Sequence, residues 1–413
     1  MDAEQYLAEI PLWTRKKNSL PEVRDFLAEM GNPDLDMRMI HVAGTNGKGS
    51  VCACLSAELV RAGYRTGMFT SPHLVTVRER IQVDGQVISR EAFQEIFERV
   101  QQLVHKMTAM GYQHPTFFEY LFLMAMSYYQ AEPVDYLILE TGLGGTLDTT
   151  NVIRNPLLTV ITSISLEHTR YLGETITAIA GQKAGIMKAG TPLVYDAGNE
   201  DANLVFRRQA GLLQVPAYPV TRPEPDRQSG FRAAYQADNA AVACQALQLL
   251  ALPGWDPEAA YERLKMVVWS GRMEEILPDV WADGAHNEAG IRAFIEAAAA
   301  IGSKTGKPIR LLFTCVADKD YSSMIRLLCD RLPMKSVIIT GLDHERTSRS
   351  EDLEQEFLAL RPELSVSGFA DTGQALKEAL RQKAEDELLF IAGSLYLIGE
   401  IKAVLEGMGC VHP

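Results

Sequence analysis

The sequence predicts an α/β protein with two domains, each built on a mostly parallel sheet. Short apolar runs alternate with amphipathic helical stretches along most of the 413 residues, a pattern typical of β-α-β units. At roughly 150 residues per domain, this length indicates two or three domains. A hydrophobic share of 47% and a charged share of 23% match ordinary globular usage, which excludes disordered and fibrous classes.

In the N-terminal part, the apolar runs and the turn residues around them predict three strands and two helices. The strands are expected at residues 39–42, 134–139 and 159–162, and the helices at 50–62 and 175–187. The turn-rich stretch 221–230 predicts a surface loop. The run 117–129 predicts core packing, because it is almost continuously apolar.

A second β-α-β series begins near residue 280. It predicts a strand that ends at residues 281–282, a helix at 288–301, and strands at 309–314, 336–340 and 388–391. Ser270 and Gly271 are suited to a hinge. We therefore expect a doubly wound, P-loop-type domain at 1–270 and a smaller Rossmann-like domain at 271–413.

Charge and cysteine usage exclude several classes of function. The net charge of −13 argues against a nucleic-acid partner or an anionic membrane surface. The six cysteines form no C-x-x-C pair, and we interpret them as small core residues. The acidic N-terminus shows no signal peptide, so we expect a cytoplasmic protein without a membrane partner.

The sharpest motif is His-Val-Ala-Gly-Thr-Asn-Gly-Lys-Gly-Ser at residues 41–50, between a predicted strand and a predicted helix. Its glycines allow backbone N–H groups to approach phosphate oxygens, and the helix N-terminus adds a positive dipole end. We expect the nucleotide contacts to come from Gly44, Thr45, Asn46, Gly47, Lys48, Gly49 and Ser50. The match to the usual P-loop is imperfect, since Val42 occupies the first glycine position and Gly49 follows the lysine.

Glu140 ends an apolar strand and precedes a glycine-rich turn. A carboxylate at the carboxyl end of a strand faces the ligand crevice of a doubly wound sheet. Because Mg²⁺ prefers hard oxygen ligands together with substrate phosphates, Glu140 is a candidate metal ligand. From the residues alone, two further candidates have simpler interpretations: His168 as a structural histidine, and Lys183 as a solvated lysine on a helix.

An ordered set of motifs resembles the folylpolyglutamate synthase/dihydrofolate synthase family, within the wider Mur ligase group. The set is Gly-Thr-Asn-Gly-Lys-Gly-Ser at 44–50, Phe-Thr-Ser-Pro-His-Leu at 69–74, Glu-Arg-Ile at 79–81, Glu-Thr-Gly-Leu-Gly-Gly at 140–145, Leu-Asp at 147–148, Asn-Val at 151–152, His168 with Leu-Gly at 172–173, Lys-Ala-Gly-Ile at 183–186, Trp269 with Gly-Arg at 271–272, Asp-Gly-Ala-His-Asn at 283–287 and Ala-Gly-Ser-Leu-Tyr at 392–396. The resemblance covers nearly the whole chain in the family's order.

The resemblance implies a metal site with two Mg²⁺ ions. Ser71 and Glu140 would hold the first ion together with the β- and γ-phosphates of ATP. Glu140, His168 and Lys183 would hold the second, with Lys183 carbamylated by CO₂ into an anionic ligand.

It also implies nucleotide contacts further along the chain. Asn239, expected at the start of a helix over 240–250, would read the adenine edge. Arg272 would bind phosphates, Asp283 would contact the ribose, and His286 would lie on the phosphate side or in the catalytic pocket. Catalytic roles are expected for Lys48, His168, Lys183 and His286.

Three positions depart from the family pattern: Thr146 stands where arginine is usual, Glu167 where aspartate is usual, and Tyr235 where histidine is usual. The metal residues are retained. Thr146 removes a cation near where an acidic substrate would lie, so substrate preference is the property we expect to change.

The resemblance implies an ATP-dependent ligase that adds L-glutamate to tetrahydrofolate, to dihydropteroate, or to both, and we expect it to act as a monomer. Three alternatives stay open at this stage. They are a Mur-type ligase acting on a nucleotide-linked precursor, a P-loop NTPase or regulator without ligase activity, and an inactive binding protein.

Overall fold

The computed structural model describes residues 2–10, 17–317, 319–342 and 347–408. By its internal contacts the chain divides into two compact units. The first comprises residues 1–227 and 237–267, and the second comprises residues 228–236 and 268–413. The predicted boundary at 270/271 stays a prediction, and the segment 228–236, which sequence reasoning placed in the first domain, belongs to the second unit.

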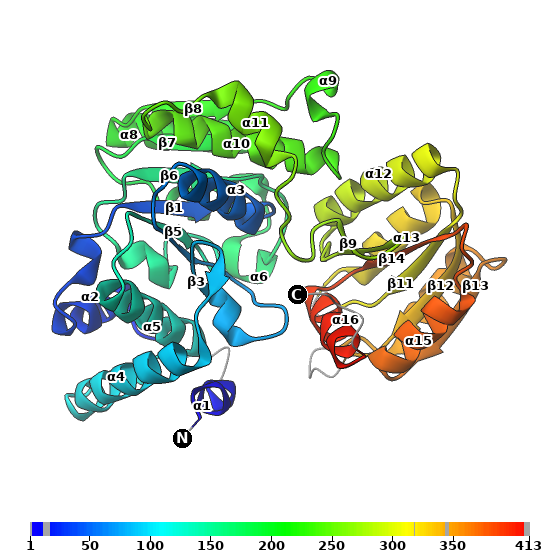
Figure 1. Cartoon of the computed structure of the whole chain (residues 1–413), viewed down its shortest axis with the longest axis horizontal. Helices are drawn as coiled ribbons and strands as arrows, with labels where there is room; N and C mark the ends of the chain where they lie inside the picture. The colour runs from blue at the N-terminus through cyan, green and yellow to red at the C-terminus, as the bar shows by residue number, and fades with distance from the viewer. Residues whose placement is uncertain (1, 11–16, 318, 343–346, 409–413) are drawn as a thin grey trace. The chain divides into compact units, whose positions relative to one another are not determined.

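The first unit is built on an eight-stranded sheet (Figure 1). Its strands, in spatial order, are β4 (Gln86–Val87), β3 (Ile81–Val83), β2 (Thr66–Phe69), β5 (Tyr136–Glu140), β1 (Met39–Ala43), β6 (Leu158–Ile161), β7 (Leu193–Asp196) and β8 (Ala217–Val220). The pairings from β2 to β8 are parallel, and β3 and β4 add an antiparallel edge. This confirms the predicted mostly parallel sheet.

Helices of the first unit pack in groups on this sheet: α3 contacts β1, β2 and β5, α4 packs with α5, and α7 packs with α8. They are α1 (Ala3–Glu9), α2 (Leu20–Glu29), α3 (Lys48–Arg61), α4 (Arg90–Ala109), α5 (Phe117–Ala131), α6 (Thr169–Leu172), α7 (Ile176–Ala184), α8 (Glu200–Leu213) and α11 (Pro257–Leu264), with the short 3₁₀ turns η1 (Pro33–Leu35), η2 (Val77–Arg80) and η3 (Thr149–Val152). The apolar run of α5 lies in the core, as predicted.

Two helices lie where the chain passes between the units. The short helix α9 (Pro225–Gln228) falls within the stretch predicted as a loop. Helix α10 (Ala234–Leu249) begins in the second unit, and from Ala237 onward its residues belong to the first.

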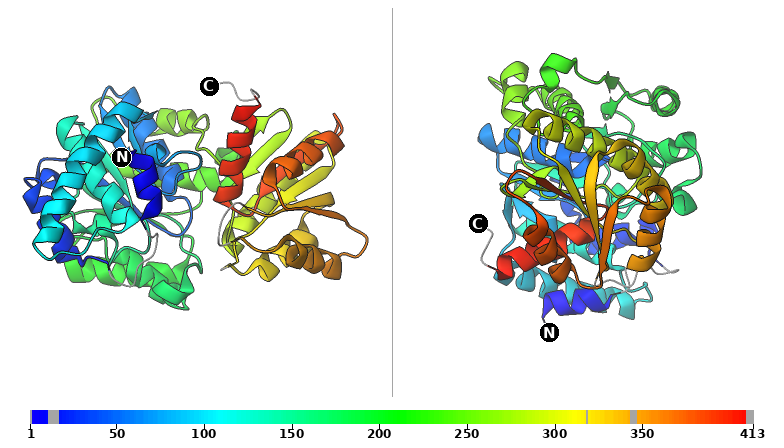
Figure 2. Two further views of the ribbon diagram at one scale, coloured as in Figure 1. Left: turned by 90° about the horizontal axis from the view of Figure 1, so that it is seen from below. Right: turned by 90° about the vertical axis from the view of Figure 1, so that its right-hand side faces the viewer.

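The second unit has a six-stranded sheet in the order β13 (Ser365–Phe369), β12 (Met334–Thr340), β11 (Ile309–Phe313), β14 (Leu388–Ala392), β10 (Val280–Asp283) and β9 (Glu274–Leu277). Only β9 runs antiparallel to its neighbour. Helices α12 (Glu288–Thr305), α13 (Tyr321–Arg331) and α14 (Ser350–Leu360) pack side by side, and α15 (Thr372–Gln382) packs with α16 (Leu395–Gly407). Two helical layers therefore cover this sheet, as the views in Figure 2 show.

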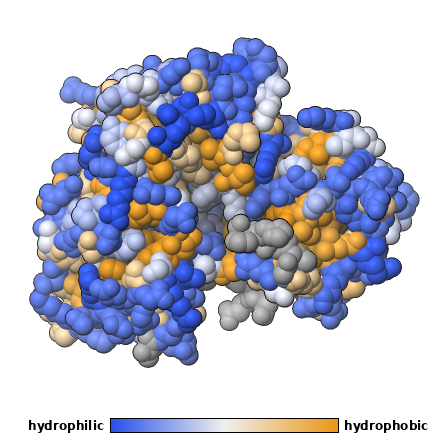
Figure 3. Space-filling model, viewed as in Figure 1, coloured by the Kyte–Doolittle hydropathy of each residue, from blue (hydrophilic) through white to orange (hydrophobic). Residues whose placement is uncertain are grey.

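The cysteine interpretation holds for most of the described positions. Cys52, Cys54, Cys315 and Cys329 are buried free thiols, Cys244 is half-buried, and Cys410 lies outside the described residues. Among the described helices, none is both long and apolar enough to cross a membrane. Hydrophilic residues cover most of the face drawn in Figure 3, with apolar patches between them.

Candidate nucleotide and metal site

Four loops of the first unit leave the same edge of its sheet. Strands β2, β5, β1 and β6 are consecutive and parallel, so their carboxyl ends lie side by side. Ser71 follows β2, Glu140 ends β5, residues 44–50 follow β1, and His168 follows β6. Strand order reverses here, because the chain goes from β1 to one side and later returns to the other, which is where ligands bind in doubly wound sheets.

Two glycines give the loop at 44–50 its shape. Gly44 has φ +151° and Gly47 has φ +87°, conformations that side chains other than glycine rarely adopt. A Cβ on Gly44 would lie 1.8 Å from Thr162 Oγ1, and one on Gly47 would lie 2.2 Å from Asn239 Oδ1. Glycine is therefore required at both positions, because a side chain there would collide with Thr162 or Asn239.

Hydrogen bonds fasten this loop to the segment after β6. The Thr45 N–H donates to the Ser163 carbonyl at 2.8 Å, and the Thr162 hydroxyl donates to the Asn46 carbonyl at 2.6 Å. The Lys48 ammonium donates to the Thr45 carbonyl at 3.2 Å, so it lies over the loop. Helix α3 starts at Lys48 and directs its N-terminal N–H groups and dipole toward the same place.

Side-chain oxygens that could bind a cation lie at the end of β5 and in the first turn of α3. Glu140 is 3% exposed, and its Oε2 accepts a hydrogen bond from the Ser71 N–H at 2.9 Å. The hydroxyls of Ser50, on α3, and Thr141 are buried without a hydrogen-bond partner. Thr141 was missed by sequence reasoning, and its only sequence signal is its place directly after Glu140.

This donor set suits a cation that is also held by substrate oxygens. Among the described residues, no three His, Cys, Asp or Glu side chains gather into a metal-binding group. Mg²⁺ usually takes only one or two carboxylates together with substrate phosphates and keeps the rest of its shell as water. Glu140 with neighbouring hydroxyls fits that requirement.

Lys183 is buried at this site. It lies on α7, is 4% exposed, and its Nζ donates to the Gly44 carbonyl at 2.7 Å. Burial, reinforced by the nearby charge of Lys48, lowers the pKa of Lys183 to about 7, while Glu167 acts in the opposite direction. The interpretation of Lys183 as a solvated helix lysine, drawn from spacing alone, is therefore wrong.

His168 directly precedes the short helix α6. It is half-buried and has φ +50°, a left-handed conformation that costs energy for a non-glycine residue. Helix α6 packs closely on the glycine-rich turn after β5, because a Cβ on Gly144 would lie 2.9 Å from Leu172 Cδ2. The loop of His168 and the turn after Glu140 are thus fixed against each other.

Asn239 is placed differently from the prediction. Helix α10 begins at Ala234, so Asn239 lies in its second turn and does not start it. The side chain is 8% exposed and packs on Gly47, as the 2.2 Å approach to a Cβ there indicates. The predicted adenine contact needs only the Asn239 side chain, so it does not depend on where the helix begins.

The remaining predicted residues gather in the second unit, at the end of β10. Asp283 is 3% exposed and accepts from the Ala285 N–H at 2.9 Å. Burial raises the pKa of Asp283, and the Arg272 charge opposes that shift. His286 Nδ1 lies 2.6 Å from the Gly284 carbonyl, so Nδ1 carries the proton and donates it.

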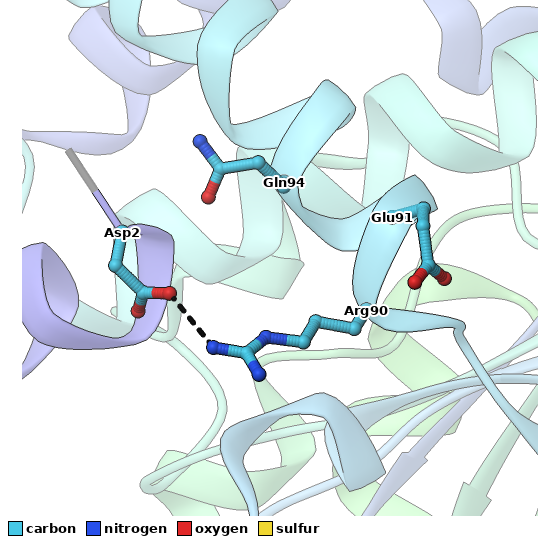
Figure 4. Close-up of a pocket in the computed structure, with 4 residues that line it drawn as sticks. All are labelled: Asp2, Arg90, Glu91 and Gln94. Atoms are coloured by element: carbon cyan, nitrogen blue, oxygen red, sulfur yellow. Dashed lines mark hydrogen bonds and ion pairs between the residues drawn. The ribbon is translucent and has the colours of Figure 1, made fainter.

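A crevice elsewhere in the first unit, at the starts of α1 and α4, is a weaker candidate (Figure 4). Its lining residues are Asp2, Arg90, Glu91 and Gln94. Asp2 pairs with Arg90 at 3.2 Å, and Gln94 Oε1 accepts from the Ala3 N–H at 2.9 Å. These groups already bond within the protein, and none of the predicted site residues lies here.

Comparison with known proteins identifies the family. Residues 271–395 match the Mur ligase, glutamate ligase domain family. The chain is 33% identical to the dihydrofolate synthase/folylpolyglutamate synthase of Bacillus subtilis (strain 168), over 94% of this chain and 95% of that protein. The chain belongs to the folylpolyglutamate synthase/dihydrofolate synthase family.

Solved structures of family members have the same fold. The folylpolyglutamate synthase of Mycobacterium tuberculosis, complexed with ADP and AMPPCP, is 26% identical with a TM-score of 0.85 and 97% coverage of both chains. The bifunctional enzyme of Yersinia pestis, complexed with AMPPNP and a Mn ion, is 26% identical with a TM-score of 0.83, again at 97% of both chains. The family resemblance and the α/β fold predicted from the sequence are both confirmed.

The three departures from the usual folylpolyglutamate synthase pattern each have a structural setting. The Thr146 hydroxyl donates to the Gln182 carbonyl at 3.0 Å, and so fixes the glycine-rich turn to α7. The negative charge of Glu167 raises the pKa of Lys183 and so opposes the effect of burial. The Tyr235 hydroxyl donates to Asp283 Oδ2 at 2.5 Å.

Proposed function

We propose that the protein is an ATP- and Mg²⁺-dependent amide ligase that adds L-glutamate to the γ-carboxylate of tetrahydrofolate, and also to dihydropteroate. The observation that carries this proposal is the gathering of the 44–50 loop, Glu140 and Lys183 at one sheet edge, in a chain of this family. The ligands bound by the Mycobacterium tuberculosis enzyme (ADP and AMPPCP) and the Yersinia pestis enzyme (AMPPNP and a Mn ion) support a nucleotide and a divalent cation as ligands here.

The nucleotide contacts that the resemblance implies are kept as proposals, residue by residue. The N–H groups of the 44–50 loop and the Lys48 ammonium would bind the β- and γ-phosphates, because both present positive charge at the start of α3. Asn239 would contact the adenine, Asp283 the ribose, and Arg272 and His286 the phosphates.

The metal assignment keeps two ions. Ser71 and Glu140 would hold one, and Glu140, His168 and carbamylated Lys183 the other, while the hydroxyls of Ser50 and Thr141 lack partners within the protein. Bound Mg²⁺ would neutralise charge on the transferring phosphoryl group.

Lys183 needs its modification for this role, because an ammonium has no lone pair for a cation. Its neutral amine would attack CO₂ and lose a proton, which leaves an N-bound carboxylate. Burial of Nζ beside the Gly44 carbonyl supports this step. With a pKa of about 7, a large part of Lys183 is neutral at physiological pH, whereas a solvated lysine is almost fully charged.

The reaction then proceeds by activation of the folate carboxylate. A carboxylate oxygen attacks the γ-phosphorus of ATP, ADP leaves, and an acyl phosphate forms. The α-amine of glutamate attacks the acyl carbon, and the tetrahedral intermediate expels phosphate. Lys48 and the loop N–H groups offset the charge on the phosphoryl group during transfer and cost no reorganisation.

Exposed apolar side chains beside the site suit a flat heteroaromatic substrate. Leu147 is 65% exposed, Leu166 51% and Tyr171 64%, and all three flank the loops that follow β5 and β6. Large apolar residues that are left exposed in loops carrying a polar site are typical of ligand contacts. They would contact the pterin.

The test is ADP release by the purified protein with Mg-ATP and L-glutamate, in the presence of tetrahydrofolate, dihydropteroate or no pterin, with products weighed by mass spectrometry. We expect a gain of one glutamate residue on each pterin and one ADP per bond. Lys48→Ala should abolish turnover; near-full activity of this variant would contradict the phosphate-loop assignment.

The alternative functions give different results in the same assay. ATP hydrolysis indifferent to glutamate and pterin would indicate an NTPase or a regulator. Gain on only one pterin would make the enzyme monofunctional. That the chain is a cytoplasmic monomer without nucleic-acid partners stays a prediction.

A further inference from the structure

A half-buried tyrosine, distant in the sequence, holds the carboxylate of Asp283. Tyr235 lies in the first turn of α10, and its hydroxyl donates to Asp283 Oδ2 at 2.5 Å. Its ring packs on the apolar core of the second unit. Burial and the adjacent carboxylate raise the pKa of Tyr235 well above its ordinary value, so the hydroxyl keeps its proton and remains a donor.

Asp283 in turn fixes the backbone on either side of it. Its Oδ2 also accepts from the Met273 N–H at 3.0 Å, and its Oδ1 accepts from the Ala285 N–H at 2.9 Å. These three hydrogen bonds to the carboxylate are all made within the second unit. The carboxylate joins α10, the strand that begins after Met273 and the turn after β10.

The residue that this carboxylate holds is strained. Met273 is fully buried and has φ +41°, a conformation that is unfavourable for a non-glycine residue and that persists only where its surroundings impose it. Such strain is typical of functional sites. Met273 directly follows Arg272, so its conformation sets the direction in which the Arg272 side chain leaves the backbone.

Arg272 lies against the same turn. A Cβ on Gly284 would lie 2.7 Å from Arg272 Nη1, and the Gly284 N–H donates to the Gly271 carbonyl at 2.7 Å. The segment 271–273 is thus tied to residues 283–284 by two hydrogen bonds and one side-chain contact. The guanidinium has little freedom while these ties hold.

We propose that Tyr235, Asp283 and Met273 form a clamp that aims the guanidinium of Arg272, and that Tyr235 is a positioning residue for nucleotide phosphates. This clamp depends on the proposed function in one respect, because it assumes that Arg272 binds the phosphates of the nucleotide. Without the Tyr235 hydroxyl, Asp283 lacks one donor and holds Met273 less firmly, so Met273 relaxes and Arg272 turns away. Since tyrosine replaces the usual histidine here, this form of the clamp is a property of this chain.

The alternative is that Tyr235 only fills space in the core. A double-mutant cycle separates the two, because residues that act through one another do not have additive effects. The measurement is the affinity of the full chain for Mg-ADP by titration calorimetry. It needs no pterin and no turnover, so it is independent of ligase activity.

We expect Tyr235→Phe to weaken Mg-ADP binding about tenfold, the low end of what a hydrogen bond to a charged group contributes. Arg272→Ala should weaken it at least as much, and the double variant no more than Arg272→Ala alone. Tyr235→His, which keeps a ring N–H donor, should stay within about threefold of the wild type.

Tyr261→Phe is the matched control. It removes another buried hydroxyl that contacts α10, at the Ala237 carbonyl, and should leave Mg-ADP affinity unchanged.

Three results would overturn the clamp: an unchanged affinity in Tyr235→Phe, additive effects in the double variant, or no Mg-ADP binding by the wild type. Thermal unfolding of each variant shows whether it is folded. If Tyr235→Phe does not fold, Tyr235→Leu, which lacks a donor, takes its place in the cycle, and Tyr235→His, which keeps one, is its comparison. A wild type that binds Mg-ADP with these variant effects but glutamylates no pterin would contradict the proposed function and support the clamp.

Discussion

His41 makes the stability of the first unit depend on pH. It lies on β1, three residues before Gly44, and is fully buried. Thr150 Oγ1 donates to Asp148 at 2.6 Å and lies 2.8 Å from His41 Nε2, so Nε2 carries the proton and donates it. His41 Nδ1 is left buried without a partner.

Burial, with a contribution from the charge of Lys188, lowers the pKa of His41 from 6.5 to about 3. Below pH 6.5 the unfolded chain therefore binds a proton that the folded chain does not bind until about pH 3. Stability must fall as the pH falls through this window. From linkage, the loss is about 2 kcal/mol between pH 7 and pH 5 and on the order of 4 kcal/mol by pH 3.

The assay is urea unfolding at pH 7 and pH 5. The wild type should lose about 2 kcal/mol more between these two values than His41→Gln, which cannot titrate. His105→Gln, at an exposed position of α4, is the control and should keep the pH dependence of the wild type. Equal losses in the wild type and His41→Gln would refute the reasoning.

Three further predictions concern the site and the second unit. Gly44→Ala should lower kcat/KM at least about hundredfold, because its Cβ would lie 1.8 Å from a hydroxyl oxygen. Gly63→Ala, also at positive φ but in open space, is the control and should keep activity. Equal activities of the two variants would contradict the steric argument. Lys183→Ala should lower kcat by a factor of about 100 or more, and acetate should restore part of it by returning an anionic oxygen; full activity without acetate would remove the carbamate from the mechanism. Glu387 is buried beside Arg310 at 2.5 Å, which lowers its pKa from 4.5 to about 2. Glu387→Gln should therefore reduce the unfolding free energy by about 3 kcal/mol at pH 7, and the difference should disappear as the pH falls from 4.5 to about 2. Equal unfolding free energies at pH 7, measured with urea, would contradict this prediction.

The sequence predicts the elements whose signal is local. A strand followed by glycines and a helix predicts a tight turn into the helix N-terminus, and the segment 44–50 has that form. Glu140 is likewise found at the end of its strand. Both predictions use residues adjacent in the chain, where the physics of turns and helix ends is decisive.

The failures concern contacts between distant segments. Helix spacing alone predicts that Lys183 is solvated. It cannot show that the Lys183 ammonium binds the carbonyl of Gly44, which lies 139 residues away in the chain. The bond from Tyr235 to Asp283 spans 48 residues, and the same carboxylate accepts from the N–H of Met273, whose φ is positive. The start of α10 was misplaced at Asn239, since the residues before it carry no strong cap.

The most direct test of the central claim follows oxygen atoms through the reaction. The folate γ-carboxylate is labelled with ¹⁸O at both oxygens, and the phosphate released with Mg-ATP and L-glutamate is analysed by mass spectrometry. Activation through an acyl phosphate predicts one ¹⁸O in each phosphate and one in each new amide. Unlabelled phosphate, released whether or not the folate is present, would contradict the account.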